Sequence, residues 1–527
     1  MGLVAQGGID LFAVGGGALL AACGWLWLRH AGSTRLRPCW ALLLDLFLPA
    51  GGFALLAAAT ARPLFAGAAT AALAAGLAYA DRAKLKVLAE PVVFTDVFQA
   101  FDILRHPRLA LPFPRQGRLL CAVAAALGAF AVLFAAEPPA WRWNPWPPLA
   151  AAALDGAVIL ALGGGLRSRI ARHLLRGGLR GDPATDVPRF GPLAVLLGYG
   201  IVAGHQRAGR QSAAPPPAPA VPLRRPAPAP LVLVQCESFF DARRLHPAIA
   251  PGLLPAYDRC RGGSVQWGRL EVPSWGANTV RTEFAVLSGL AGERLGFDRF
   301  NPYHRFAGVP VATLAWQLRA EGYRTICLHP FDRRFYGRDR VMPKLGFDRF
   351  IGLEGFAGAQ RVNGYVADVE VARKAAQIVA AEGPAVFVFA ITMENHGPWH
   401  AAEQTPQAGP PRGLTLPPGQ ARLLQPYLRS LRNADAMLQI LAEALAGGGR
   451  PGMLAFYGDH LPAFGAAFAE LGLRDLRTDY FIWSAARGGA RRRDLAAHEL
   501  RGAILEARAQ LALRASPAGW EKVLQAG

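Results

Sequence analysis

A pair of residues that can bind a metal ion lies at the end of an apolar run. The run 453–456 predicts a buried strand, and Asp459 and His460 follow it closely. Adjacent side chains on an extended strand point in opposite directions, so both can bind one ion only where the strand breaks into a turn. Leu461-Pro462 supplies such a break, because proline cannot continue a strand ladder. The pair therefore predicts a metal site at the tip of a strand.

A carboxylate and a hydroxyl occupy comparable positions earlier in the chain. Glu237 follows the largely apolar run 231–236, and a charge directly after a buried strand costs free energy unless it is paired or metal-bound. Taken alone, it also fits a surface carboxylate. Thr279 stands where a turn opens a predicted helix, so it is either a cap supported by Glu283 or a nucleophile.

These four residues form a coherent ligand set. One Glu, one Asp, one His and a hydroxyl oxygen suit Mn²⁺, Mg²⁺ or Zn²⁺, whereas a soft-metal site would require thiolates. A bound metal lowers the pKa of a hydroxyl, and a helix N-terminus favours a bound phosphate. The set predicts metal-assisted phosphoryl transfer, with Thr279 as the nucleophile that attacks phosphorus.

Further polar residues stand near the ends of other predicted strands. His329 follows the run 325–328, and a loop with an aromatic ring and a guanidinium comes next, at Tyr336 and Arg338. His396 follows the run 385–391. A single histidine is more often structural, but three strand-end histidines in one half of the chain are harder to explain that way. We expect this group to contact a phosphate or substrate.

The half of the chain that carries these residues, 231–527, alternates short apolar runs with helical patterns. Five strands are predicted, at 231–236, 325–328, 385–391, 453–457 and 480–483. Four helices are predicted, at 282–290, 311–321, 368–381 and 424–446. This alternation predicts an α/β domain, in which ligands bind beyond the carboxyl ends of the strands.

The first half of the chain is predicted to lie in a membrane. Hydrophobic residues make up 52% of the 527 residues, and the excess is concentrated before residue 205. Five apolar stretches are long enough to cross a bilayer, at 9–28, 40–60, 63–80, 119–136 and 149–166, and 190–203 is a shorter sixth candidate. We therefore expect an α-helical transmembrane bundle of five or six spans at 1–205. A linker rich in Pro and Ala, 206–230, separates it from the catalytic half.

The placement of arginine gives a topology. Basic residues cluster after the first, third and fifth spans, and the positive-inside rule assigns these loops to the cytoplasm and the N-terminus to the outside. An external catalytic half then requires 190–203 to be a sixth crossing. The alternative has five crossings with the N-terminus inside, and arginine-rich interfacial helices bound to anionic lipid. The net charge of +20 is explained by these flanks, so we expect no nucleic-acid partner.

Two acidic residues and six cysteines raise secondary questions. Asp45 and Asp155 fall inside predicted spans, where an ionisable residue is either functional or paired with a neighbouring helix. The cysteines show no metal-binding spacing and fit scattered structural thiols. A disulfide between Cys260 and Cys327 is an open alternative.

The order of these motifs resembles the lipoteichoic acid synthase family, which consists of membrane-anchored phosphoglycerol transferases of the alkaline phosphatase/sulfatase superfamily. The resemblance covers about 231–483 and rests on a few segments. They are Glu237, Thr279, His329 with Phe335-Tyr336-Gly337-Arg338-Asp339, Thr392-Met393-Glu394-Asn395-His396, and Tyr457-Gly458-Asp459-His460. The first half of the chain is similar to the family in layout only. Tyr336 stands where the family often has Trp, which retains an aromatic wall but changes the shape of the pocket.

The resemblance implies a sulfatase-like catalytic fold and the following roles. Glu237, Thr279, Asp459 and His460 hold one divalent metal, usually Mn²⁺, and Thr279 is the nucleophile. His329, Tyr336, Arg338 and His396 contact the phosphoglycerol. Glycerophosphate passes from phosphatidylglycerol to Thr279 and then to an envelope glycan or polymer, or to water. The resemblance also implies a multi-pass protein of the bacterial cytoplasmic (inner) membrane, with its catalytic domain outside.

Three rival functions are weighed against this expectation. A sulfatase needs Cys or Ser in C/S-x-P-x-R, which the sequence at Thr279 lacks. A phosphoethanolamine transferase also uses a metal and a threonine, but those enzymes usually carry several disulfides, and only three cysteines follow residue 230. A non-catalytic protein that binds lipid headgroups would have no need of a nucleophile. The phosphoethanolamine transferase remains the leading alternative.

Overall fold

The structure is a computed structural model in which the chain divides into two compact units, Met1–Ala213 and Ala214–Gly527. It describes residues 10–35, 39–106, 116–142, 144, 146–211, 228–397, 418–447, 451–464, 468, 470, 471, 473–486 and 489–514. Most of the predicted linker, 206–230, lies outside the described residues. Each unit is described below by itself.

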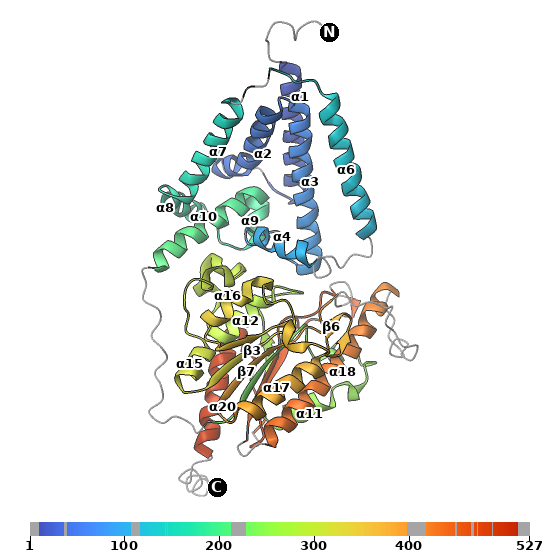
Figure 1. The fold of residues 1–527 in the computed structure, drawn as a ribbon, viewed down its shortest axis with the longest axis vertical. Helices are drawn as coiled ribbons and strands as arrows, with labels where there is room; N and C mark the ends of the chain where they lie inside the picture. Colours follow the sequence, from blue (N-terminus) through green and yellow to red (C-terminus); the bar gives the residue numbers. More distant parts are fainter. Residues whose placement is uncertain are drawn as a thin grey trace. The chain divides into compact units, whose positions relative to one another are not determined.

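The first unit is helical, as predicted (Figure 1). Its helices are α1 (Leu11–Ala31), α2 (Cys39–Thr60), α3 (Pro63–Leu88), α4 (Asp96–Arg105), α6 (Gln116–Ala136), α7 (Trp146–Gly163), α8 (Arg167–Arg176), α9 (Pro183–Phe190) and α10 (Pro192–Gln211). Among the described residues, four helices are long and apolar enough to cross a membrane: Leu11–Ala31, Cys39–Thr60, Pro63–Lys86 and Trp146–Gly163. The apolar stretch Cys121–Ala136 of α6 is shorter. These helices mark the chain as a membrane protein.

Hydrogen bonds between loops show which helix ends lie together. The Asp10 N–H donates to the Ala140 carbonyl at 2.9 Å, and the Ala140 N–H donates to the Ala61 carbonyl at 2.7 Å. The Glu137 carboxylate accepts two backbone N–H groups from the first turn of α3. The start of α1, the end of α2 and the end of α6 therefore share one end of the unit. The C-terminal ends of α1, α3 and α7 lie at the opposite end (Figure 1).

Asp45, on α2, joins its helix to α1 and α10. Its fully buried carboxylate accepts a hydrogen bond from the Trp25 indole at 2.9 Å and pairs with the Arg29 guanidinium at 2.6 Å. It also accepts the backbone N–H groups of Leu193 and Ala194, at 2.9 and 3.0 Å, in the first turn of α10. A carboxylate at a helix N-terminus is stabilised by the helix dipole. The sequence left open whether Asp45 is functional or paired with a neighbouring helix, and these contacts are those of a residue paired with neighbouring helices.

The stretch predicted as a sixth crossing, 190–203, is not one continuous helix. Phe190 ends α9, Gly191 has a φ of 104°, and Pro192 begins α10. A Cβ at Gly191 would lie 2.5 Å from the Asp45 carboxylate oxygen, so both the backbone angle and the close approach require glycine. Among the described helices, α10 is not one of those long and apolar enough to span. The break lies at the start of the predicted stretch, and residues 192–203 all belong to α10.

The second unit is the predicted α/β domain, built on a mixed sheet of nine strands. The strands are β1 (Leu231–Cys236), β2 (Ser264–Glu271), β3 (Arg324–Leu328), β4 (Arg349–Ile351), β7 (Val386–Ile391), β8 (Met453–Gly458), β9 (Thr478–Ser484), β10 (Arg491–Arg492) and β11 (Leu495–Ala496). Their order is β10-β2-β9-β8-β1-β7-β3-β4, with β11 also paired to β2. A separate hairpin joins β5 (Arg361–Val362) and β6 (Tyr365–Val366).

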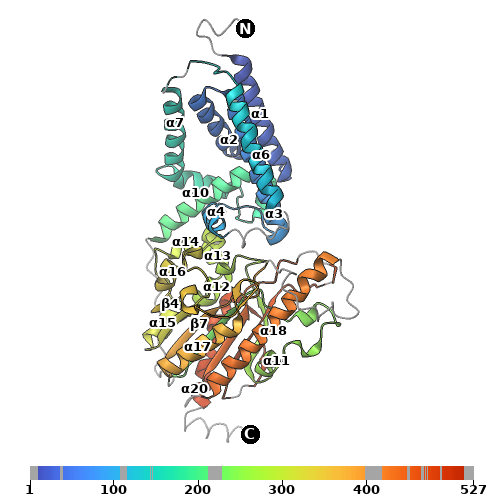
Figure 2. The same cartoon turned by 45° about the vertical axis from the view of Figure 1, so that its right-hand side comes forward.

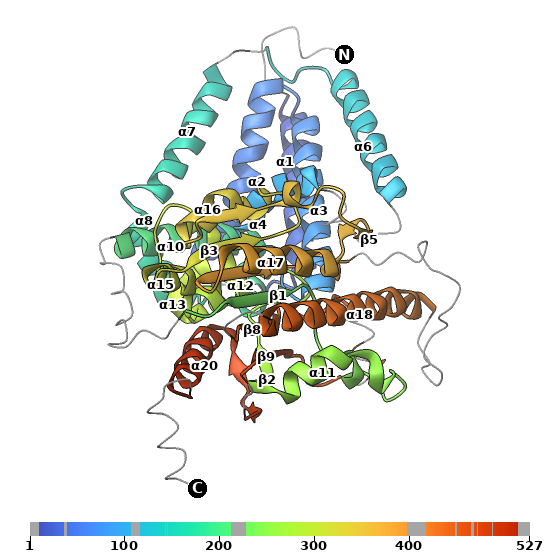
Figure 3. The same ribbon diagram turned by 60° about the horizontal axis from the view of Figure 1, so that its bottom comes forward.

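Helices cover both faces of the sheet (Figures 2 and 3). Among the described residues, the α-helices of this unit are α11 (Pro255–Gly262), α12 (Thr279–Ser288), α13 (Gly292–Leu295), α14 (Tyr303–Phe306), α15 (Leu314–Ala320), α16 (Arg338–Lys344), α17 (Asp368–Glu382), α18 (Pro418–Ala446) and α20 (Leu500–Arg514). Alternate residues of β1 face opposite cores, Val232 and Val234 toward α17 and α18, and Leu231 and Leu233 toward α12 and α15. Burial on both faces explains why the central strands read as continuous apolar runs.

The sheet topology places the predicted site residues along one edge. Strands β8, β1, β7 and β3 are adjacent and parallel, so their carboxyl ends point the same way. Glu237 directly follows β1 and His329 directly follows β3, while Asp459 and His460 follow β8. His396 lies five residues beyond the end of β7. Side chains from four separated segments therefore meet beyond one edge of the sheet.

Candidate metal centre

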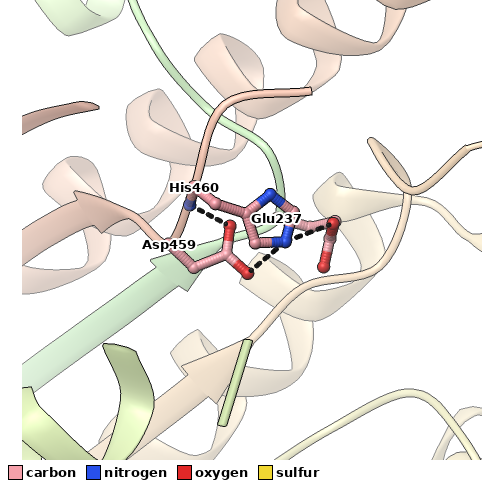
Figure 4. A group of neighbouring side chains, drawn as sticks. All are labelled: Glu237, Asp459 and His460. Carbon is pink, nitrogen blue, oxygen red and sulfur yellow. Dashed lines mark hydrogen bonds and ion pairs between the residues drawn. The ribbon is translucent and has the colours of Figure 1, made fainter. Parts of the chain in front are cut away.

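The structure brings together Glu237, Asp459 and His460 (Figure 4). All three are buried, and each offers one ligand atom within 4.8 Å of the others. His460 Nε2 lies 3.4 Å from Asp459 Oδ2 and 3.6 Å from Glu237 Oε1. The Thr279 hydroxyl is 3.5 Å from the same nitrogen. The four residues predicted as metal ligands thus surround one point.

The register of two strands produces this convergence. Cys236 is paired with Gly458 in the parallel ladder between β1 and β8, so Glu237 and Asp459 emerge at the same level. Gly458 is required there, because a Cβ would lie 1.9 Å from the Phe239 carbonyl oxygen. The chain from β1 can therefore cross directly over the end of β8 only where the side chain is absent.

The hydrogen bonds of His460 fix which ring nitrogen faces the carboxylates. Its Nδ1 lies 3.1 Å from the Leu461 carbonyl oxygen, which can only accept, so Nδ1 carries the proton. Nε2 then presents a lone pair toward Asp459 Oδ2 and Glu237 Oε1. Three electron-rich atoms in one buried space repel one another unless a cation or a proton lies between them. A histidine whose second nitrogen donates to a carbonyl is the usual arrangement of a metal ligand.

The two oxygens of Asp459 have different surroundings. Oδ1 accepts the backbone N–H of Ser238 at 2.8 Å and that of His460 at 2.9 Å. Among the residues that the structure describes, Oδ2 is buried without a hydrogen-bond partner. A buried carboxylate oxygen without a partner carries a desolvation cost, which a metal ligand bond would remove. The residues present therefore fit a divalent cation.

Electrostatics support the same reading. Burial, and after it the nearby charge of Asp459, raise the pKa of Glu237 to about 8. A carboxylate close to a second carboxylate holds its proton until a positive charge replaces it. Glu237 is thus poised to exchange a proton for a metal ion.

Thr279 is the first residue of α12, and its side chain is half-buried. The residue that caps the helix is Asn278, whose backbone is left-handed with a φ of 63° and whose side chain makes no capping bond. The capping alternative for Thr279 therefore does not describe its position. The neighbouring turn is tied to the metal site, because the Thr282 hydroxyl donates to the Asp459 carbonyl at 2.8 Å.

Ser238 completes the centre and was not selected from the sequence. Its backbone N–H binds Asp459 Oδ1, and its hydroxyl donates to Glu237 Oε1 at 2.8 Å. Its φ of 51° is unusual for a residue with a side chain. A small polar residue directly after Glu237 is the only sequence signal, and that signal does not reveal the backbone angle. Ser238 holds both carboxylates in place.

The predicted substrate contacts divide into two groups. His329 and Arg338 are buried, at 1% exposure each, and the Arg338 guanidinium donates to His329 Nε2 at 3.2 Å. Tyr336 and His396 are partly exposed. Tyr336 has a φ of 57° and lies against Arg338, with 5.3 Å between the guanidinium carbon and the ring centroid. Such strain in a bulky residue often marks a ligand site.

His396 lies near the metal-binding residues. Its Nδ1 is 2.5 Å from the Gly397 carbonyl oxygen, so Nδ1 carries the proton and Nε2 is the basic nitrogen. Burial lowers the pKa of His396, and the charge of Asp459 opposes that shift. The ring also packs against Tyr365, with centroids 5.7 Å apart. His396 therefore lies within electrostatic reach of the candidate metal centre.

Comparison with known proteins identifies the domain. Residues 264–500 match the sulfatase family. These residues form a sulfatase-family domain. Thr279, Asp459 and His460 lie inside the matched region, and Glu237 precedes it. The match confirms the superfamily that the sequence resemblance implied, and the sulfatase-family domain follows the apolar helices of a membrane protein.

Individual relatives cover only parts of the chain. The capsular polysaccharide biosynthesis protein RkpI of Rhizobium meliloti (strain 1021) is 39% identical over 268 residues, which cover 50% of this chain and 46% of RkpI. The chain thus spans about half the length of the curated relatives it matches.

Solved structures similar to the sulfatase-family domain include two kinds of transferase. One is the Streptococcus pyogenes phosphoglycerol transferase GacH in complex with sn-glycerol-1-phosphate, with 25% identity, 55% of this chain and 78% of that chain covered, and a TM-score of 0.45. Another is the soluble domain of lipooligosaccharide phosphoethanolamine transferase A from Neisseria meningitidis. It is 16% identical, the match covers 54% of this chain and 90% of that chain, and the TM-score is 0.38.

All six cysteines are free, including Cys236, Cys260 and Cys327, which are buried in the sulfatase-family domain. The open alternative of a disulfide between Cys260 and Cys327 is therefore not realised in this structure.

We predict that metal binding stabilises the protein more at high pH. Glu237 must lose a proton to bind metal, so affinity falls about tenfold per pH unit below about 8. Without metal, the raised pKa of Glu237 stabilises the fold only at low pH. That contribution is lost as the pH rises from 4.5, the ordinary pKa of the carboxyl group, to about 8. In a thermal melt, Mn²⁺ at about 100 times its Kd should raise Tm by roughly 5–10 °C at pH 8.5.

The upshift should shrink markedly at pH 6.5 and disappear in Asp459→Asn at both pH values. An equal upshift at the two pH values, or an upshift retained in Asp459→Asn, would contradict the proposed ligand set.

A pair of substitutions at Ser238 separates its hydroxyl from its backbone. Ser238→Ala and Ser238→Gly both remove the bond to Glu237 and keep the N–H bond to Asp459, so each should weaken Mn²⁺ binding about tenfold. Only glycine suits a φ of 51°, so Ser238→Gly should be more stable than Ser238→Ala by about 1 kcal/mol. Isothermal titration and thermal melts measure both effects.

Ala490→Gly, at another left-handed position, with a φ of 45°, is the matched control and should leave Mn²⁺ affinity unchanged. Wild-type affinity in Ser238→Ala would show that the hydroxyl does not hold the centre.

Proposed function

We propose that this protein is a metal-dependent phosphoglycerol transferase that moves glycerophosphate from phosphatidylglycerol to an envelope glycan or polymer. The observation that carries the proposal is the position of the Thr279 hydroxyl, 3.5 Å from His460 Nε2, beside the buried cluster of Glu237, Asp459 and His460. A half-buried hydroxyl beside a fitting cation site is an activated nucleophile. The sulfatase-family match and the preceding apolar helices support a substrate that is a phosphate or sulfate ester near a membrane.

The proposed reaction has two displacement steps at phosphorus. Thr279 Oγ1 attacks the phosphorus of phosphatidylglycerol, the bond to the diacylglycerol oxygen breaks, and the hydroxyl proton ends on diacylglycerol. Thr279 is then esterified with glycerophosphate. An acceptor hydroxyl attacks the same phosphorus, the Thr279 oxygen leaves, and the acceptor proton returns to it. A divalent cation held by Glu237, Asp459 and His460, which we propose is Mn²⁺, would lower the pKa of the Thr279 hydroxyl and neutralise phosphate charge.

The remaining site residues are assigned by their exposure. Tyr336 and His396 are partly exposed, so we assign them to direct contact with the glycerophosphate. His329 and Arg338 are buried, and Arg338 contributes positive charge from behind the site. The N-terminus of α12 directs backbone N–H groups toward a phosphate bound at Thr279.

The proposal includes a place in the cell. The donor lipid stays in the bilayer, which explains why several apolar helices precede the catalytic domain. We place the protein in the bacterial cytoplasmic (inner) membrane, with the catalytic domain outside, where envelope polymers are decorated. The relative RkpI is named for capsular polysaccharide biosynthesis, and a polysaccharide is the acceptor class we favour.

Mass spectrometry of Thr279 tests the reaction. After incubation of the full-length protein with Mn²⁺ and phosphatidylglycerol, a tryptic peptide containing Thr279 should carry glycerophosphate, and diacylglycerol should be released. Thr279→Ala should lose the modification and lower turnover by more than about 1,000-fold. Ser288→Ala, a hydroxyl at the other end of α12, should retain both.

The mass added to the peptide also decides between donors. Phosphoethanolamine on Thr279 after incubation with phosphatidylethanolamine, and nothing after phosphatidylglycerol, would replace the proposal with the phosphoethanolamine transferase. Unmodified Thr279 with both lipids, together with undiminished lipid binding, would favour the headgroup-binding protein.

A reporter fusion tests the topology. Because α10 is not a candidate span among the described helices, the proposal requires residue 183, the first of α9, to lie outside, with the N-terminus inside. The arginines at that end then contact anionic headgroups, against the positive-inside rule. An alkaline phosphatase fusion after residue 183 should be active, and a green fluorescent protein fusion there should be dark. An inactive alkaline phosphatase fusion and a fluorescent green fluorescent protein fusion would place residue 183 in the cytoplasm. The catalytic domain would then lie outside only if the chain crosses the membrane once more after residue 183.

A further inference from the structure

A buried ion pair between Glu283 and Arg338 connects α12, the helix that carries the nucleophile, to α16. Glu283 is fully buried on α12, one turn after Thr279. Its Oε2 lies 2.8 Å from Arg338 Nη2, and its Oε1 lies 3.4 Å from Arg338 Nε. The two parallel contacts form a fork, which is the most directional arrangement of this pair.

The pair continues to the end of β3. Arg338 Nη1 donates to His329 Nε2 at 3.2 Å, so that nitrogen is unprotonated. His329 Nδ1 lies 3.4 Å from the Ile391 carbonyl oxygen and carries the proton. The two contacts demand the same tautomer. Burial, and then the charge of Arg338, lowers the pKa of His329 well below its usual range, so the ring is neutral.

Glu283 also receives hydrogen bonds from two other elements. The Tyr303 hydroxyl at the start of α14 donates to Oε1, and the Gln235 amide on β1 donates to Oε2 at 3.4 Å. Gln235 is held in turn by the Tyr457 hydroxyl on β8. Glu283 is therefore fixed by α14, α16 and β1, and β1 and β8 are the strands that end in the metal-binding residues.

A buried ion pair is weak evidence for stability, because desolvation of both charges offsets their attraction. Its directionality is a better reason for its presence. Thr279 and Glu283 are four residues apart and share one face of α12. Fixing the Glu283 carboxylate therefore fixes both the rotation of α12 and the depth at which the Thr279 hydroxyl meets His460.

We propose that Glu283 is a positioning residue for the transfer reaction. It orients α12 so that the Thr279 oxygen is in line for attack, and it holds the Arg338 cation against His329 beside the phosphate. Glu283 touches neither substrate nor metal. This inference rests on the proposed function, because it concerns the same nucleophile.

The test compares two buried Glu–Arg pairs in the full-length protein. Glu283→Gln removes the charge at constant shape, and Glu321→Gln does the same to the pair between Glu321 and Arg508, with oxygen and nitrogen 2.9 Å apart and side chains 6% and 9% exposed. Misplacing a reacting group by about 1 Å costs about 100-fold. Glu283→Gln should therefore lower kcat about 100-fold with KM for phosphatidylglycerol nearly unchanged, whereas Glu321→Gln should keep kcat within about twofold.

Two measurements exclude a general loss of folding. The Tm upshift with Mn²⁺ should persist in Glu283→Gln, since the metal ligands are untouched. Glu283→Asp keeps the charge on a shorter side chain and should recover part of the lost kcat. A kcat loss in Glu283→Gln no larger than that in Glu321→Gln, or a loss that appears in KM alone, would overturn the inference. So would loss of the Mn²⁺ upshift, which would make Glu283 a residue of general structure.

A second substrate separates this inference from the proposed function. The same variants are assayed with bis(4-nitrophenyl) phosphate, whose cleavage needs the nucleophile but no lipid. A wild-type protein that cleaves this diester and does not modify Thr279 with phosphatidylglycerol disproves the donor and still allows Glu283 to be judged by kcat. A wild-type protein inactive on both substrates disproves the proposed function and this inference together.

Discussion

The repulsion among Glu237, Asp459 and the His460 lone pair is the constraint on which the catalytic unit depends. Two charged carboxylate oxygens within 4.8 Å of each other repel by at least about 3 kcal/mol at an effective dielectric constant of about 20. The chain tolerates this arrangement because each group has a second contact, which for Glu237 is the Ser238 hydroxyl. Ser238 and His460 donate N–H groups to one oxygen of Asp459, and the Leu461 carbonyl orients the imidazole. The sheet therefore holds the three groups close together and relies on a cation to neutralise them.

Much of this arrangement could be predicted from the sequence. A strand buried on both faces must read as a short apolar run, so 231–236 and 453–457 mark β1 and β8, and a charged residue at the end of such a run stands out. The order of strands is not encoded in any single run. That β1 lies directly beside β8 depends on packing of the whole sheet, and only this neighbour relation brings Glu237 to Asp459.

Other features could not be predicted, because they depend on contacts between distant residues. Ser238 is an unremarkable serine until its φ of 51° and its two bonds are seen. Arg338 was expected at the substrate, since a guanidinium beside an aromatic residue suits phosphate. The sequence does not indicate its burial against Glu283, 55 positions earlier, and its contact with a substrate stays a prediction. The stretch 190–203 is apolar enough for a short span, but the docking of Gly191 on Asp45 divides it.

Asp45 and Asp459 show how a structural carboxylate differs from a functional one. Both are fully buried, and both were singled out because an acid in an apolar setting needs a partner. Asp45 has its partners within the protein: two backbone N–H groups on one oxygen, and an indole and a guanidinium on the other. In Asp459 one oxygen is equally well satisfied, but the other faces a nitrogen lone pair and has no donor among the described residues. Burial is the same, so the missing donor is what distinguishes a site that requires a ligand from a joint between helices.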